Sequence, residues 1–338
     1  MTENHIPLTS SEIASLWTSY LNNTMSHCIM GYFLETVENA DIKPIVDYSY
    51  QLTKEHTTFL KNTFSKENFA MPVGFTDSDV NFKAPPLYSD EFILEYINQM
   101  AKVGTFVYGG FLAMSTRKDL REHFSACLAG TINLYNLGTD VSLEKGLYTR
   151  PPTIPVPCQA DYIDNKSYLS GLNPFSEKRP LNAIEISHLF LNIETNLLGS
   201  LLCTSFAQTA KDEHVRKFMV RGKDISKKHI KVFGETLLKS EIEPPMASSS
   251  TCLTASTIAP FSDKLMMFHI DFLSAGGMGN YSTAGAASQR TDVILNYQRL
   301  AIEIGNFAKD GADIMIKNNW MEQPPCAPDR DKLINQPK

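Results

Sequence analysis

Residues 8–16 read LTSSEIASL and residues 181–189 read LNAIEISHL, so four of the nine letters recur after 173 positions. Sliding the whole sequence against itself by the same 173 positions aligns Leu8–Pro152 with Leu181–Pro325 without a gap. Of the 145 aligned positions 26 are identical, whereas average residue usage predicts about nine identities by chance. The repeat therefore indicates duplication of one whole domain, because solenoid repeats have periods of only about 20–50 residues.

The length of the chain agrees with two domains. A single hydrophobic core rarely serves more than about 250–300 residues, and this chain has 338. The segment between the copies carries prolines at both of its ends, and proline at this density favours a stiff, extended connector. We therefore expect a first domain over residues 1–152, a proline-rich linker over 153–180, and a second domain with a C-terminal tail over 181–338.

The spacing of apolar residues predicts helices. In the first copy these residues recur at intervals of three and four over residues 13–37, 42–64, 89–111 and 120–141, which is the pattern of four amphipathic helices. The same pattern recurs 173 positions later. The fold class that we expect is all-α, with two four-helix bundles in tandem.

The connection between the second and third helices is unusually long. Residues 67–88 are rich in proline, and 22 residues of extended chain reach about 70 Å, whereas a helix of 26 residues is only about 39 Å long. This segment can therefore run the full length of a bundle and make the second and third helices parallel. One long crossover between short turns is typical of ferritin-like bundles.

Several polar residues fall on the apolar stripes of these helices, and most of them occur in both copies. Because the first two helices join at a short turn, an asparagine about 16 residues before it and a histidine about 16 residues after it should face each other. We expect a polar layer in the middle of each bundle, made of Asn23, His56, Tyr108 and Asn133 in the first copy, with His27 beside them, and of Asn196, His229, Tyr281 and Asn306 in the second.

Two interpretations of this layer stay open. Asn, His and Tyr can satisfy one another's hydrogen bonds, so the layer is a structural cluster in the first interpretation. In the second, it binds a small ligand or a metal ion such as Fe, Mn or Zn. The metal site of ferritin-like bundles requires a Glu three residues before the histidine, but Thr53 and Ser226 stand there. The structural interpretation is therefore preferred, and no cofactor is expected.

The charge of the chain is small and unevenly distributed. A net charge of −6 argues against a general nucleic-acid-binding protein. Residues 214–239 carry eight Lys and Arg against two Asp and Glu, and we prefer to interpret them as a solvated helix face. The alternative is an anion-binding surface, or one that docks on the acidic first domain, made of Arg216, Lys217, Arg221, Lys223, Lys227, Lys228 and Lys231.

The sequence also bears on the compartment. The polar N-terminus lacks a basic segment followed by an apolar one, and no apolar run approaches the roughly 18 residues of a membrane span. The six cysteines are scattered, with no C-x-x-C pair, which favours reduced and mostly buried thiols. We expect a cytoplasmic protein that has no membrane partner.

Several short motifs carry a family resemblance. They are VGFT at 73–76, LYSD at 87–90, PFSDKL at 260–265 and WME at 320–322. With them the chain resembles domain-of-unknown-function family 3231 over nearly its whole length. The resemblance implies tandem ferritin-like bundles in the cytoplasm of spore-forming Gram-positive bacteria, where some relatives are described as spore-coat-like. The family has no established activity, so it implies no catalytic residues.

These observations lead to a functional hypothesis. No complete catalytic constellation is present, so we expect a non-enzymatic protein with a structural or binding role, which the resemblance links to sporulation. The alternative is a divergent ferritin-like protein that binds a metal or a small ligand at the polar layer. The partners that we expect are the two bundles packing on each other, with a further protein partner or a homo-oligomer left open.

Overall fold

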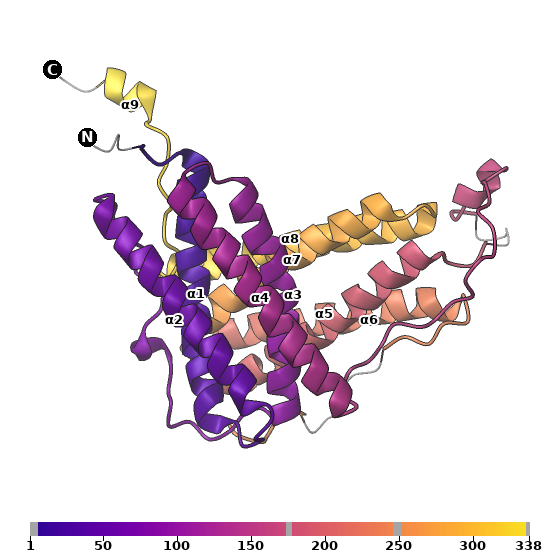
Figure 1. The fold of residues 1–338 in the computed structure, drawn as a ribbon, viewed down its shortest axis with the longest axis horizontal. Coiled ribbons are helices and arrows are strands. Elements are labelled where there is room, and N and C mark those ends of the chain that lie inside the picture. The colour runs from indigo at the N-terminus through magenta and orange to yellow at the C-terminus, as the bar shows by residue number, and fades with distance from the viewer. Residues whose placement is uncertain (1–5, 174–177, 246–251, 336–338) are drawn as a thin grey trace.

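The computed structural model describes residues 6–173, 178–245 and 252–335, and it confirms an all-α duplicated fold. The first copy forms α1 (Ser10–Thr36), α2 (Lys43–Lys66), α3 (Asp90–Ala113) and α4 (Lys118–Glu144). The second copy forms α5 (Ala183–Thr209), α6 (Glu213–Leu238), α7 (Asp263–Ala287) and α8 (Thr291–Lys317), and the short helix α9 (Arg330–Ile334) lies in the tail. Figure 1 shows the two bundles, the first in indigo and magenta and the second in pink to yellow.

A buried glutamate ties the start of each bundle together. Thr9 and Glu12 form a capping box at the start of α1, and the Oε1 atom of Glu12 accepts the backbone N–H groups of Thr116 and Arg117 at 2.9 Å each. The start of α1 therefore lies against the turn between α3 and α4. Glu185 holds the same position in the second bundle, where it accepts the backbone N–H of Arg290 at 2.8 Å.

The opposite end of each bundle is tied by an aspartate. Asp90, at the first position of α3, accepts the backbone N–H groups of Glu38 and Asn39 in the turn between α1 and α2. Asp263 makes the equivalent bonds in the second bundle. Because α3 starts where α2 starts, these helices run parallel, and residues 67–89 cross the length of the bundle as predicted.

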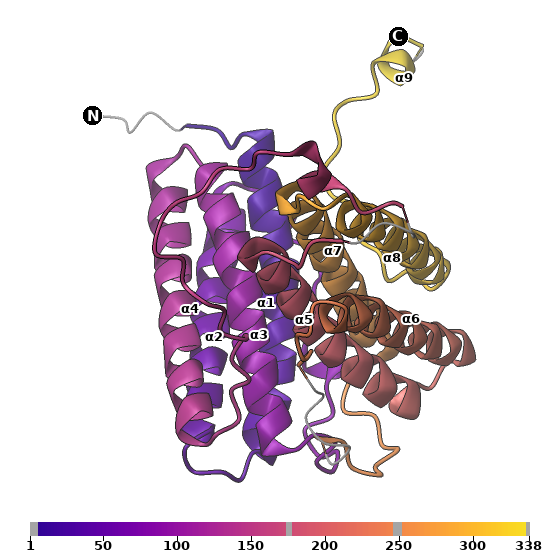
Figure 2. The same ribbon diagram turned by 90° about the vertical axis from the view of Figure 1, so that its right-hand side faces the viewer.

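The two crossovers pair with each other symmetrically. Val80 forms an antiparallel bridge with Phe261, and Tyr88 forms one with Leu253. Positions 80 and 253 are repeat equivalents, as are 88 and 261, so an approximate twofold axis relates the halves. The hydroxyl of Tyr96 lies 3.0 Å from Nε2 of its own repeat equivalent, His269, where α3 meets α7. Figure 2 shows the two bundles side by side.

The hydrophobic core has three parts. One cluster is shared by both bundles and contains buried residues such as Phe33, Tyr96 and Phe206. Each bundle also has an outer cluster at its far end, around Phe124 in the first and Tyr297 in the second. The apolar packing of each bundle is therefore divided at the middle, which is the level where the polar layer was expected.

The linker and the tail bind the surface of the bundles. In residues 153–173 and 178–180, the described part of the linker, the chain is extended apart from the 3₁₀ turn Lys166–Leu169. The guanidinium of Arg179 stacks 4.0 Å from the ring centroid of Tyr168. In the tail, the carboxylate of Glu322 accepts the backbone N–H groups of Val73 and Gly74 at 2.7 and 2.8 Å, which fastens the tail to the first crossover.

Two further sequence expectations can be compared with the described residues. None of their helices is long and apolar enough to cross a membrane. None of the six cysteines, all within the described ranges, forms a disulfide; four are buried, while Cys158 and Cys326 are exposed.

Candidate functional site

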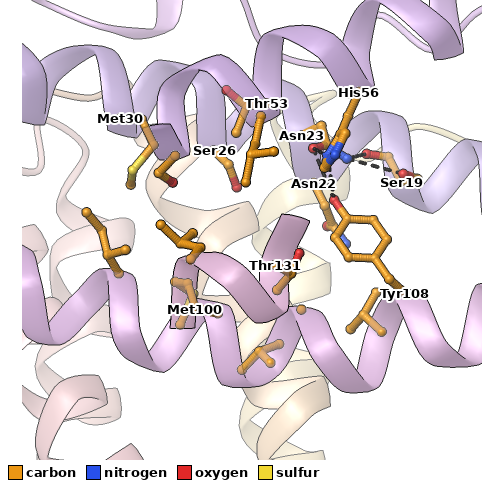
Figure 3. A pocket seen from close by; sticks show the side chains of 18 of the residues that line it. Ser19, Asn22, Asn23, Ser26, Met30, Thr53, His56, Met100, Tyr108 and Thr131 are labelled. Atoms are coloured by element: carbon orange, nitrogen blue, oxygen red, sulfur yellow. Dashed lines mark hydrogen bonds between the residues drawn. The ribbon is translucent and has the colours of Figure 1, made fainter. Parts of the chain in front are cut away.

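The polar layer of the first bundle is a closed triangle of hydrogen bonds. Nδ1 of His56 lies 3.1 Å from Oδ1 of Asn23 and 3.2 Å from the hydroxyl of Tyr108, and that hydroxyl donates to Oδ1 of Asn23 at 3.2 Å (Figure 3). The amide group of Asn23 donates to the carbonyl of Ser19 at 2.8 Å, which fixes its orientation. Three helices, α1, α2 and α3, thus converge at one level as the sequence predicted.

The second bundle assembles the same three residue types differently. The hydroxyl of Tyr281 lies 2.9 Å from Nδ1 of His229 and accepts Nδ2 of Asn196 at 2.7 Å. Nε2 of His229 lies 3.0 Å from Oε2 of Glu303 on α8. The result is a chain of four residues that leads from the bundle centre towards the surface, because Glu303 is partly exposed while His229 is completely buried.

A cavity of about 110 Å³ lies beside the first cluster. Asn23, His56 and Tyr108 line it together with serines and threonines such as Ser26 and Thr131, while apolar side chains such as Met30 and Leu134 give the cavity a mostly apolar surface. Figure 3 shows Met30, Met100 and Thr131 around the same space. The Oδ1 atom of Asn22, a further lining residue, is buried without a hydrogen-bond partner. One buried polar atom without a partner thus belongs to a residue that lines the cavity.

The second bundle holds an equivalent cavity, also of about 110 Å³. Asn196, His229 and Tyr281 line it, just as their repeat equivalents line the first cavity. Met100 and Phe272 line both cavities, so the two spaces lie on either side of the contact between α3 and α7. The duplication has therefore preserved a cavity together with these three polar residues.

Burial keeps the histidine and the tyrosine of each cluster uncharged near neutral pH. Loss of hydration lowers the pKa of His56 to about 4 and raises the pKa of Tyr108 well above its ordinary value. The pKa of His229 is also lowered by burial, although the carboxylate of Glu303 acts in the opposite direction. Burial likewise raises the pKa of Tyr281. These side chains are therefore better suited to form hydrogen bonds with a guest than to pair with a charge on it.

Three other predicted residues lie elsewhere. His27 points towards α2, where its Nδ1 lies 3.1 Å from Oγ1 of Thr53 and its ring stacks on Tyr50, so it is outside the triangle. Asn133 and Asn306 are exposed on α4 and α8, and their expected place in the layer is corrected. Each is adjacent to a buried residue of the stripe, and a shift of one position turns a helical side chain by about 100°.

The basic residues of α6 are distributed along the exposed part of that helix. Their carboxylate partners lie within the second bundle: Lys217–Glu213, Arg221–Asp310, Lys223–Asp224, Lys228–Glu303 and Lys231–Glu235. Arg216 donates to the carbonyl of Ala210 at the turn before α6. This local pairing favours a solvated helix face, while Lys227 remains exposed on the same helix.

Two contributors to these sites were not predicted from the sequence. His123 on α4 lies against His56, with ring centroids 5.9 Å apart, and stacks on Phe59. His123 lies three residues after Leu120 on the apolar stripe, and this spacing could have identified it from the sequence. Glu303 was missed because its repeat equivalent is Gly130, so the comparison of copies did not identify it.

The donors of the clusters suit hydrogen bonding better than metal binding. Within the described ranges, no three His, Cys, Asp or Glu side chains come together in a group that could hold a metal ion. The first cluster presents an imidazole, an amide and a phenol whose pKa is raised, whereas oxygen-activating iron requires carboxylates.

Comparison with known proteins places the chain in a family. A family model described as "Protein of unknown function (DUF3231)" matches residues 1–159 and again residues 169–333. No curated protein matches. Among solved structures, a candidate spore coat protein of Bacillus halodurans C-125 is similar at 19% identity and a TM-score of 0.42, covering 45% of this chain and 98% of that one. With the family model matched over both repeats, this chain belongs to the DUF3231 family of proteins of unknown function.

Proposed function

We propose that this protein is a non-enzymatic binding protein that holds one small guest in the centre of each bundle. The observation that supports this most is the recurrence of one cavity beside one Asn–His–Tyr cluster in both halves. Only 26 of 145 aligned positions are identical, yet all three cluster residues are among them. A core that needed only stability could fill such a space with apolar side chains, since filling a cavity commonly stabilises a protein.

The cavities restrict the size and the chemistry of the guest. An engineered cavity of about 150 Å³ is large enough for benzene, so spaces of about 110 Å³ suit a small ring or a short chain. The walls are mostly apolar, and the histidine and the tyrosine that line the first cavity are uncharged near neutral pH. The guest class that we propose is a small, largely apolar molecule with one hydrogen-bonding group, such as a short amide or alcohol.

The biological setting that we propose is the cytoplasm of a spore-forming bacterium, and it rests on the family resemblance in the sequence. Binding a small guest is compatible with a structural role during sporulation, because a guest that binds only the folded state stabilises it. Following the abundance of the protein through a sporulation time course would test this setting separately from the binding itself.

The binding role can be tested with methionine methyl resonances. Met30 lines the first cavity only and Met100 lines both. In protein labelled at the methionine methyl carbons, titration with butyramide should shift both resonances in a saturable way. The variants Ala101→Leu and Ser274→Leu place a larger side chain at equivalent positions of the first and second cavities, and Ala113→Leu on the exposed end of α3 is the matched control.

Each variant has a defined expected result. Ala101→Leu should abolish the shift of Met30 and keep the part of the Met100 shift that arises from the second cavity. Ser274→Leu should keep the shift of Met30 and remove the part of the Met100 shift that arises from the second cavity. Ala113→Leu should leave both titrations unchanged. Shifts that persist in both cavity-filling variants, or the absence of any saturable shift in the parent protein, would contradict the proposal.

A further inference from the structure

The hydrogen bonds of the second cluster run in one direction. Nδ2 of Asn196 donates to the carbonyl of Asn192 at 2.6 Å, so this nitrogen also donates to the hydroxyl of Tyr281. That hydroxyl then has its own proton to donate to Nδ1 of His229, and Nε2–H of His229 donates to Glu303. The order of tyrosine, histidine and carboxylate matches that of serine, histidine and aspartate in a catalytic triad, where the carboxylate holds the imidazole tautomer and stabilises the imidazolium.

The first cluster has no such outlet. Gly130 stands at the position of Glu303, and His56 has no carboxylate within hydrogen-bonding distance among the described residues. Its neighbour His123 is a second base whose pKa burial lowers to about 3. A proton added to His56 would therefore remain buried without a counter-ion, which is strongly unfavourable.

A proton added to His229 has a counter-ion. Nε2–H of the imidazolium continues to donate to Glu303, and the new Nδ1–H donates to the hydroxyl of Tyr281. That hydroxyl then accepts from both Asn196 and His229, and its own proton is released to donate into the cavity. No bond between heavy atoms changes. Because Nε2 already carries the proton that is bonded to Glu303, the added proton enters from the cavity side: the hydroxyl of Tyr281 passes its proton to Nδ1 and takes up the new one.

The charged groups around His229 come from two helices. Glu303 on α8 favours the imidazolium, while Lys228 on α6 and Arg299 on α8 oppose it. Lys228 is held 2.8 Å from Oε1 of Glu303, which neutralises part of that carboxylate. The facing residues are Tyr281 on α7 and Asn196 on α5, and both are uncharged. An anionic guest in the cavity would add the second negative charge that balances the proton and the lysine together.

We propose that the second bundle binds small carboxylic acids as their anions and takes up one proton on His229 as it does so, whereas the first bundle accepts only neutral guests. The anion and the proton enter together, so the buried net charge does not change. The released hydroxyl proton of Tyr281 is the donor for the guest carboxylate. This inference rests on the proposed binding function and names the guest class of one of its two sites.

Calorimetry with a matched pair of guests tests it. Butyrate and butyramide have nearly the same shape and differ in charge. Titrations of the full chain at pH 7.5 in phosphate and in Tris, whose heats of ionisation differ, count the protons taken up with each guest. We expect about one proton with butyrate and none with butyramide. Glu303→Gln should weaken butyrate binding at least tenfold and abolish the proton uptake, and Glu235→Gln, on the exposed face of α6, is the control.

The outcomes separate this inference from the binding function itself. Butyrate binding that takes up no proton, or that survives Glu303→Gln with its uptake intact, overturns the inference while butyramide binding still supports the function. Failure of both guests to bind overturns both. Butyramide binding by the first bundle shows that Glu303→Gln is folded, and loss of the butyrate heat in Ser274→Leu locates the anion in the second cavity.

Discussion

The two clusters contain the same three residue types, but their hydrogen bonds are organised differently. In the first bundle the amide oxygen of Asn23 accepts from both partners and closes a triangle, whereas in the second the amide nitrogen of Asn196 donates and begins a chain. The chain continues because Glu303 replaces Gly130. A duplicated backbone can therefore keep two sites in register while a single position changes what each can do.

The largest expected difference concerns the glutamates that tie the bundles at their outer ends. Glu12 and Glu185 are completely buried and accept equivalent backbone bonds, but Glu185 also pairs with Arg179 at 2.8 Å. Glu185→Ala leaves a mostly buried guanidinium unpaired and should cost about 3–5 kcal/mol of unfolding free energy. Glu12→Ala leaves only unpaired neutral donors and should cost about 1–3 kcal/mol.

Hydrogen exchange read by mass spectrometry can measure these losses separately, because it reports opening of each bundle. Glu91→Ala on the exposed first turn of α3 is the control and should change stability by less than about 0.5 kcal/mol. Equal losses in the two bundles would show that the pairing with Arg179 contributes little.

The second prediction concerns the stability of the first bundle at acidic pH. Burial raises the pKa of Glu12, but the hydrogen bonds from Thr9, Arg117 and Thr116 outweigh it and lower the pKa to about 2, against an ordinary value of 4.5. A lowered folded-state pKa stabilises the protein fully above about pH 4.5, and this contribution is lost as the pH falls towards 2. Glu12→Gln should therefore flatten the loss of first-bundle stability between pH 4.5 and 2. An unchanged slope in urea titrations across this range would contradict the assignment.

The third prediction transfers the carboxylate from one bundle to the other. Gly130→Glu should raise the pKa of His56 above its value of about 4, by roughly one or two pH units, because an opposite charge nearby favours the imidazolium. Glu303→Gly should lower the pKa of His229 further for the same reason. A Cβ at position 130 would approach a methyl group of Leu52 to 2.9 Å, so that side chain must shift.

Nitrogen and proton shifts of the histidine rings, followed against pH, measure both pKa values. Gly130→Gln is the control because it has the same shape without the charge. If Gln raises the pKa of His56 as much as Glu does, the effect comes from the rearranged Leu52 and the electrostatic comparison between the bundles fails.

The fold was predictable where local pattern and duplication agreed. Asn23, His56 and Tyr108 were identified because each lies on an apolar stripe and recurs, and helical geometry then brings them to one level. Asn133 recurs as well, but it is exposed because the apolar stripe of its helix lies one position away. Its recurrence alone therefore led to a wrong prediction. The contact between Tyr96 and His269 could not be read from either copy, because it depends on how two finished bundles dock.

The smallest expected effect has opposite signs in the two bundles. Gly104 and Gly277 are repeat equivalents in the middle of α3 and α7, and alanine is favoured over glycine in a helix by about 1 kcal/mol. A Cβ at Gly104 would lie 2.8 Å from a methyl group of Thr131, whereas at Gly277 the nearest neighbour, a methyl group of Ile304, is at 3.6 Å. Gly277→Ala should therefore stabilise the second bundle by up to about 1 kcal/mol, and Gly104→Ala should destabilise the first by about 1 kcal/mol or more.

The double variant Gly104→Ala/Thr131→Ser, which removes the opposing methyl group, should recover most of that loss. If Gly104→Ala alone stabilises the first bundle, α3 and α4 are free to move apart there, and the two cavities differ in rigidity as well as in charge.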